Sequence, residues 1–458
     1  MHTLTGNRDQ VLDLMQHTID QMQNSDQASA ASIGSPEGDV VAKLNDGLME
    51  AQASDSGAVA ASIDFAAKQN DDWYVPRNQS VAVFQSMMDE YLAQKNAPEA
   101  PPQPSGGASG EARAASIGGD ELTHEQVKAS VFYKDPGGGT PPPAPEMDMA
   151  MAAALIEQFS NLDPGWIAWV WEKAKARLKG KHEFPTHVTA GNVNFEMGDE
   201  TTIAVVGDWG GGNEAAQAVA EQIKKIKPDH IIHLGDVYYS GTEKEVKERF
   251  LQYWPAPDAP GRSFALNSNH EMYSGGYGYF DVCLPEFKQP ASYFTLTNKN
   301  WRLIGLDTGY DDHDLHSPQT DWLREQLVDD GRKTILFSHH QLFSAYENED
   351  CSALVGKVKE FTDAGKIYGW IWGHEHLCVT YQPYMNLKAV CLGNGCFPYN
   401  PPTVQAKVPI EWLNNRAQPD DDDYKGVHTF ALLTISSDKI EIQYIDQDGF
   451  VGHTQTWS

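Results

Sequence analysis

Aspartate, asparagine and histidine residues follow a series of short apolar runs in the second half of the chain. The run at 231–234 leads into Gly235-Asp236, and four other runs end in a similar way. A short apolar run predicts a buried strand, and neighbouring strands of an α/β sheet present their last side chains at one edge. A single such ending means little, because Asp and Asn are common turn residues. Five endings in order, the last of them His-x-His, predict a metal site made by Asp208, Asp236, Asn269, His339, His374 and His376.

The donor types of these residues divide into two sets. Asp236 has two carboxylate oxygens, so it could bridge two cations about 3.5–4 Å apart, the separation used in two-metal phosphoryl chemistry. A phenolate from Tyr239 could join Asp208 and His376 on one ion, and this mixture of donors suits trivalent iron. The other donors are neutral and suit a divalent zinc, manganese or iron ion: Asn269, His339 and His374.

Hydrolysis at such a centre also requires a proton donor. A hydroxide held between the metals would attack phosphorus in line, and His270, next to Asn269, could protonate the leaving alkoxide. His374 and His376 are two residues apart, a spacing that turns side chains to opposite faces of a regular strand. Both can therefore reach one metal pair only if Gly373 opens a turn.

The composition narrows the classes of partner. A formal charge of −30 over 458 residues argues against electrostatic binding of nucleic acid, because phosphate backbones require a basic surface. A phosphorylated small molecule remains compatible, because metal ions would supply local positive charge. The sequence has neither a membrane span nor a signal peptide, so we expect a cytoplasmic protein, although secretion without a signal would leave no trace. Five cysteines without zinc-type spacing favour buried thiols, with a Cys391–Cys396 disulfide as the alternative in an oxidising compartment.

Residues 1–145 form a low-complexity region that we expect to be largely disordered or helical. Pro- and Gly-rich segments at 101–107 and 136–143 predict linkers. The region could pack on the main domain or dock a protein partner, and its deletion is expected to leave active enzyme. Two amphipathic helices are predicted by apolar residues that share one face: Leu12, Met15, Ile19 and Met22 in the first, and Phe84, Met87, Tyr91 and Leu92 in the second.

The rest of the chain divides into a connecting part and a catalytic part. Residues 146–199 predict a helical pair, Met149 to Phe159 and Trp166 to Leu178, followed by a linker. From 200 to 458 predicted strands and helices alternate, which indicates an α/β sandwich of mixed sheets. A loop at 307–317 could line the pocket, although a solvated loop is favoured; its candidate residues are Asp311, Asp312, His313 and His316.

The motifs, taken in order, resemble those of the calcineurin-like metallophosphoesterases. They are Gly-Asp-x-Gly at 207–210, Gly-Asp-x-x-Tyr at 235–239, Asn-His-Glu at 269–271, a strand-end histidine and Gly-His-x-His at 373–376. Most of that superfamily has a histidine ligand where this chain has Gly210. The loss of that histidine together with Tyr239 is similar to the purple acid phosphatase branch. The resemblance covers about residues 200–400 and implies a metallophosphoesterase-type αββα sandwich.

The resemblance also implies roles for individual residues. Iron(III) would be held by Asp208, Asp236, Tyr239 and His376, and the divalent ion by Asp236, Asn269, His339 and His374. His270 would be the general acid, and His340 and Glu271 would lie just outside the ligands. The expected function is phosphoester hydrolysis by a phosphatase. The alternatives are a phosphodiesterase of the same fold and an interaction protein that uses the domain as a platform.

Overall fold

The computed structural model describes residues 8–24, 36–53, 75, 77–95, 180–256, 261–397, 406–416 and 426–458. The predicted helical pair between 149 and 178 and the two predicted linkers lie outside these residues. None of the described helices is long and apolar enough to cross a membrane.

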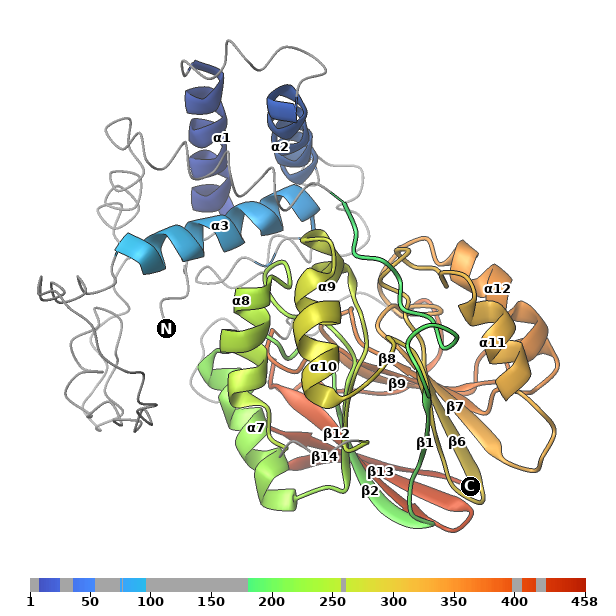
Figure 1. Cartoon of the computed structure of the whole chain (residues 1–458). Helices are drawn as coiled ribbons and strands as arrows, with labels where there is room; N and C mark the ends of the chain where they lie inside the picture. The colour runs from blue at the N-terminus through green and yellow to red at the C-terminus, as the bar shows by residue number, and fades with distance from the viewer. Residues whose placement is uncertain are drawn as a thin grey trace, which may run out of the picture.

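Two mixed β-sheets form the centre of the catalytic domain (Figure 1). The larger has eight strands in the spatial order β1 (Asn194–Glu196), β5 (Phe294–Thr297), β6 (Trp301–Gly305), β7 (Lys333–Ser338), β8 (Gly369–Trp372), β10 (Lys388–Leu392), β9 (Cys378–Tyr381) and β11 (Ile410–Leu413). The smaller has six, in the order β14 (Val451–Trp457), β13 (Lys439–Asp446), β12 (Thr429–Ser436), β2 (Glu200–Val206), β3 (His230–His233) and β4 (Ser263–Ala265). Strands β2, β3 and β4 are parallel, and so are β6, β7 and β8, so each set delivers its carboxyl ends to one edge.

Alternating side chains of each strand serve two different layers. In β2, Ile203 and Val205 pack into the core between the sheets, while Ala204 and Val206 pack into the outer core. This division follows from the two-residue period of a strand and confirms the predicted sandwich.

Helices cover the outer faces of both sheets (Figure 1). Helix α7 (Glu214–Ile226) begins where the Asn213 side chain accepts a hydrogen bond from the Ala216 N–H, and it buries one face that includes Val219 and Ile223. Near it lies α8 (Glu243–Glu245), which continues through a π-helical turn (Val246–Phe250) and a 3-10 turn (Leu251–Tyr253). The remaining helical segments are α9 (Asn269–Tyr273), the π-helical turn Tyr279–Cys283, α10 (Leu284–Phe287), α11 (Gln319–Gln326) and α12 (Ser352–Asp363).

The N-terminal region contributes three helices with a core of their own. They are α1 (Arg8–Asn24), α2 (Pro36–Ala53) and α3 (Gln79–Lys95). The predicted apolar faces are buried in this core by Leu12, Met15, Ile19, Met22, Phe84, Met87 and Tyr91. Figure 1 shows α3 lying across the top of the catalytic domain, close to α8 and α9.

All five cysteines are free thiols, and four of them, including Cys391 and Cys396, are buried. The cysteines are therefore mostly buried thiols, the alternative that their spacing favours, and Cys391 and Cys396 do not form a disulfide in this structure.

Candidate metal centre

The predicted metal ligands meet where the carboxyl ends of strands from both sheets come together. Asp208, Asp236 and Asn269 follow β2, β3 and β4 of the smaller sheet. His339 follows β7 of the larger sheet, and residues 374–376 follow β8. Because these strands belong to two sheets, neither sheet alone supplies the whole set.

Left-handed backbone conformations turn four of these residues into the centre. The φ angles are 55° at Asp208, 78° at Asp236, 69° at His374 and 53° at His376. Such angles are uncommon outside glycine and cost on the order of 1–3 kcal/mol each, so they persist where surrounding structure enforces them. The turn after β8 breaks the alternation of a strand, and both of its histidines reach the site. Gly373 is required there, because a Cβ atom would lie 2.6 Å from Asp208 Oδ2.

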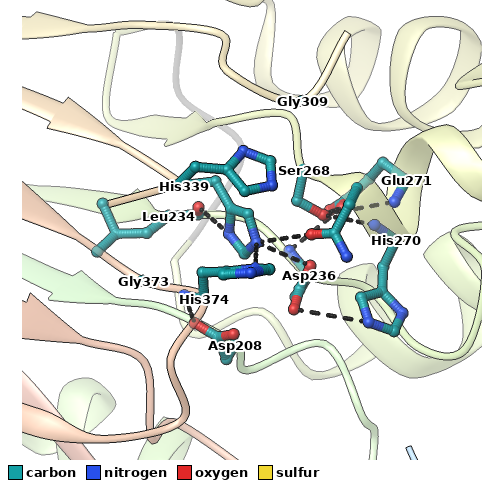
Figure 2. A network of polar contacts seen from close by, with 12 residues as sticks. Asp208, Leu234, Asp236, Ser268, His270, Glu271, Gly309, His339, Gly373 and His374 are labelled. Carbon is teal, nitrogen blue, oxygen red and sulfur yellow. Dashed lines mark hydrogen bonds and ion pairs between the residues drawn. The ribbon is translucent and has the colours of Figure 1, made fainter. Parts of the chain in front are cut away.

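His339 lies in the middle of a group of acceptor atoms (Figure 2). Its Nδ1 is 3.0 Å from the carbonyl oxygen of Leu234, which can only accept a hydrogen bond, so Nδ1 carries the hydrogen. The lone pair on Nε2 then faces three atoms: Asn269 Oδ1 at 3.0 Å, His374 Nδ1 at 3.1 Å and Asp236 Oδ1 at 3.2 Å.

The hydrogens of the neighbouring side chains also point away from this group. His374 Nε2 lies 2.9 Å from a Glu349 carboxylate oxygen and therefore carries the hydrogen, which leaves the lone pair on Nδ1. Asn269 Nδ2 donates to the Tyr273 hydroxyl at 2.7 Å, so Oδ1 faces inward. Burial lowers the pKa of His339 well below its usual value and that of His374 to about 4, so both imidazoles are neutral near pH 7. Four lone pairs thus converge with no hydrogen between them, and this arrangement fits a cation.

A second group of donors lies on the other side of Asp236. Tyr238 Oη lies 3.0 Å from Asp236 Oδ2, 3.4 Å from Asp208 Oδ1 and 3.2 Å from His376 Nε2. His376 Nε2 in turn lies 3.5 Å from Asp208 Oδ1. The two oxygens of Asp236 therefore face different donor groups, as a bridging carboxylate requires.

The two buried aspartates have opposite electrostatic environments. Burial, followed by the charge of Asp236, raises the pKa of Asp208 well above its usual value. Burial also opposes ionisation of Asp236, but nearby histidines, His339 first, outweigh burial and hold its pKa well below the usual range. A cation between the carboxylates would offset the repulsion that keeps Asp208 from ionising, because a bound metal is the largest local charge in such a site.

The aromatic residue that reaches the centre is Tyr238, and the predicted ligand Tyr239 lies on the other side of the loop. The Tyr239 ring lies against the guanidinium group of Arg249, 5.0 Å from the ring centroid, and its N–H donates to Glu245 Oε1 at 2.6 Å. The two tyrosines lie in the turn at 238–240, and in this turn the Tyr238 hydroxyl faces the aspartates while the Tyr239 ring faces Arg249. In the structure the hydroxyl beside the aspartates is therefore that of Tyr238, whereas the Tyr239 ring packs on Arg249.

His270 lies beside the centre without joining either donor group. Its Nδ1 lies 2.6 Å from the Tyr239 carbonyl oxygen and so carries a hydrogen, while Nε2 lies 4.0 Å from Asp236 Oδ2. The side chain is buried, and its ring packs edge-on against Tyr238. Nε2 is therefore the ring nitrogen that can exchange a proton with a molecule bound at the centre.

Glu271 and His340, expected just outside the ligands, both lie there. Glu271 Oε2 accepts from the Asp236 N–H at 3.2 Å and from the Ser268 hydroxyl, and burial, followed by the charge of Asp236, raises the pKa of Glu271 to about 8. The ring of His340 lies 4.7 Å from that of His374, between centroids. Glu271 thus fixes the Asp236 loop, and His340 packs behind a predicted ligand.

The loop at 307–317 contributes more to the surroundings of the centre than a solvated loop would. His313 packs on His340 with ring centroids 3.9 Å apart, and its Nε2 lies 2.9 Å from Glu349 Oε2. Although burial opposes it, hydrogen bonds to Asp312 and Glu349 raise the pKa of His313 to about 9. His316, by contrast, pairs with Asp311 at 2.6 Å and packs against Tyr310.

Comparison with known proteins relates the domain to one family. Residues 201–378 match the family model of the calcineurin-like phosphoesterases. The match covers less than half of the chain, and over these residues the sequence resembles that family. The chain is also 23% identical over 285 residues to tartrate-resistant acid phosphatase type 5 of the pig, Sus scrofa, a match covering 53% of this chain and 83% of that protein. These similarities support the expected resemblance to the purple acid phosphatase branch.

Solved structures resemble the phosphoesterase domain more distantly. GAP50, the anchor in the inner membrane complex of Plasmodium, covers 56% of this chain and 88% of its own, with 13% identity and a TM-score of 0.44. The purple acid phosphatase PPD1 of yellow lupin, Lupinus luteus, covers 56% of this chain and 53% of its own, with 16% identity and a TM-score of 0.43. A dimetal phosphatase from Danio rerio covers 56% of this chain and 98% of its own, with 12% identity and a TM-score of 0.38.

Besides Tyr238, two residues close to the phosphoesterase centre were not predicted from the sequence. Glu349 binds His374, and Arg77 of the N-terminal region binds Glu349. Neither residue belongs to a motif, and Arg77 is 272 positions away from Glu349. The carboxylate next to a metal-ligating histidine is a general expectation, but no spacing in the sequence points to this one.

Proposed function

We propose that the chain hydrolyses phosphoesters at a dinuclear metal centre and that it acts as a phosphatase. The observation that carries the proposal is the convergence of lone pairs around His339 Nε2 together with the two-sided placement of Asp236. Neutral nitrogen and amide donors suit a divalent zinc, manganese or iron ion, and the aspartate, phenol and imidazole donors suit iron(III). The calcineurin-like phosphoesterase family and the similarity to an acid phosphatase support this assignment.

The residues of the centre would have separate roles in metal binding and proton transfer. Asn269, His339 and His374 would hold the divalent ion, Asp208, Tyr238 and His376 the iron, and Asp236 would bridge the two. When bound, the two ions supply a nucleophile from water near neutral pH and stabilise negative charge on the phosphoryl oxygens. His270 would deliver a proton from Nε2 to the departing alkoxide, because its Nδ1 hydrogen is held by the Tyr239 carbonyl.

Metal analysis and a substrate panel test this proposal together. Purified protein is expected to contain two metal ions per chain, at least one of them iron, and to hydrolyse nitrophenyl phosphate faster than bis(nitrophenyl) phosphate. The reverse preference would favour the phosphodiesterase of the same fold. Protein without bound metal and without either activity would contradict the proposal.

The identity of the phenol ligand gives a second prediction. Because Tyr238 Oη lies 3.0 Å from Asp236, Tyr238→Phe is expected to abolish a visible tyrosinate-to-iron absorption band. The matched variant Tyr239→Phe removes a hydroxyl from the adjacent ring and is expected to leave the band in place. Absorption spectra of the two iron-loaded variants check this, and loss of the band in Tyr239→Phe alone would restore Tyr239 as the ligand.

A further inference from the structure

Arg77, which lies two residues before α3, extends from the N-terminal region to the outer side of the metal centre. Its guanidinium group binds both oxygens of Glu347, at 2.8 and 3.0 Å, and Glu349 Oε1 at 2.8 Å. The same group donates to the carbonyl oxygen of His374 at 3.1 Å. The Arg77 side chain is 32% exposed, whereas that of Glu347 is 4% exposed, so these contacts are partly shielded from water. A planar guanidinium is suited to contact several acceptors at once.

One path from Arg77 leads through Glu349 to a predicted ligand of the divalent ion. Glu349 uses one oxygen for Arg77 and the other for His374 Nε2, at 2.9 Å. A carboxylate that accepts from one nitrogen of a histidine fixes the ring orientation and keeps the lone pair on the other nitrogen. Here that other nitrogen is His374 Nδ1, which lies 3.1 Å from His339 Nε2.

A second path from Arg77 leads through Tyr273 to another predicted ligand. The Tyr273 hydroxyl donates to the backbone carbonyl of Arg77, because a carbonyl oxygen can only accept. The same hydroxyl accepts from Asn269 Nδ2 at 2.7 Å. An amide group held by its nitrogen must present its oxygen on the opposite side, and Asn269 Oδ1 indeed faces His339 Nε2 at 3.0 Å.

We infer that Arg77 is a positioning residue for the divalent half of the metal centre. Both paths start at this one residue. The path from its side chain orients His374, and the path from its backbone carbonyl orients Asn269. The N-terminal region thus completes a site whose ligands all belong to the phosphoesterase domain. This inference rests on the proposed dinuclear function and assigns the N-terminal region a part in it.

The test measures divalent-metal affinity in the full-length, iron-loaded protein. Arg77→Ala is expected to weaken Zn²⁺ or Mn²⁺ binding by about 10–100-fold, the usual effect of removing a group that orients a metal ligand. The iron content is expected to fall less, because Arg77 reaches Asp208 through the backbone of His374, whose carbonyl accepts from Arg77 and whose N–H donates to Asp208 Oδ2 at 2.9 Å. Arg77→Lys keeps the charge but not the planar fork, so an intermediate loss is expected. Competition with a chelator of known affinity gives the dissociation constants.

A control variant and a double variant distinguish the positioning of metal ligands by Arg77 from a general loss of contact between the N-terminal region and the phosphoesterase domain. Gln79→Ala removes a hydrogen bond of 2.8 Å from the same segment to the Tyr273 carbonyl and is expected to leave metal affinity unchanged. If Arg77 acts mainly through Glu349, the variant with both Arg77→Ala and Glu349→Ala should bind metal little worse than Glu349→Ala alone.

The possible outcomes distinguish this inference from the proposed function. Wild-type affinity in Arg77→Ala, or an equal loss in Gln79→Ala, would overturn the role of Arg77 while the wild type still hydrolyses phosphoesters. A wild type that takes up no divalent ion would overturn the proposed function and this inference together. If Arg77→Ala does not fold, Arg77→Lys tests the inference in its place. Unchanged metal affinity in Arg77→Lys would show that the planar guanidinium group is not needed to position the ligands, and would overturn the inference.

Discussion

Replacing His270 with alanine is expected to lower turnover by about 10²–10⁴-fold while both metal ions stay bound. The physical reason is the position of the ring. His270 belongs to neither donor group, its Nδ1 hydrogen is held by the Tyr239 carbonyl at 2.6 Å, and its Nε2 lies 4.0 Å from Asp236 Oδ2. The rate deficit should shrink for nitrophenyl esters, because nitrophenolate leaves as a stable anion and needs less protonation. Steady-state rates across esters of rising leaving-group pKa, with metal content measured in parallel, check this.

Two matched variants show what loss of a ligand would look like instead. Asn269→Ala and His374→Ala are expected to weaken the divalent site, and added manganese or zinc should partly restore their activity. No such rescue is expected for His270→Ala. If His270→Ala lost metal, or slowed good and poor leaving groups alike, the proton donor would have to be another residue, with His340 the next candidate.

Asp89→Ala is expected to lower the free energy of unfolding by about 3–5 kcal/mol, the usual cost of removing one partner of a buried ion pair. Asp89 of α3 pairs with Arg249 of the phosphoesterase domain, and their side chains are only 8% and 7% exposed. Arg249 also donates to the Tyr238 carbonyl at 3.0 Å, so the pair supports the loop that carries the phenol. Nearby, Ser86 Oγ donates to Glu245 Oε1 at 2.8 Å. Chemical denaturation of the full-length variant measures the loss.

Asp13→Ala is the matched control, because Asp13 is an exposed residue of α1 in the same helical region. It is expected to change the free energy of unfolding by no more than about 0.5 kcal/mol. Deletion of residues 1–145 would remove Asp89, Ser86 and Arg77 together and leave Arg249 without its Asp89 partner. We therefore expect the truncated chain to lose solubility or metal binding, which reverses the expectation from composition alone. A truncated protein as stable and active as the full chain would contradict this account of the interface.

The sequence by itself predicted the architecture of the phosphoesterase domain and the location of its centre. The runs that form β2, β3, β7 and β8 are short, apolar and closed by polar residues, and this local pattern suffices to predict buried strands. The amphipathic faces of α1 and α3 followed from helical periodicity in the same way. The order of the motifs then brought Asp208, Asp236, Asn269 and the histidines to one edge.

The tertiary structure decided which side chains contact one another across long separations. Whether Tyr238 or Tyr239 faces the aspartates depends on the direction of a loop that Arg249 and Glu245 hold from outside. A motif fixes only the spacing of two residues along the chain, and the conformation of the turn that carries them decides which side chain reaches the centre.

The role of the N-terminal region was likewise decided by tertiary contacts. Its composition resembles that of a flexible extension, yet Asp89 is buried against Arg249 and Arg77 reaches Glu349 and His374. A charged side chain has no periodicity of its own from which to predict burial, and it becomes stable inside a protein only when a partner from another element meets it. The aspartates, the asparagine and the histidines of the centre could therefore be predicted from local pattern, whereas the tyrosine beside them and the residues that hold them in place could be found only in the folded chain.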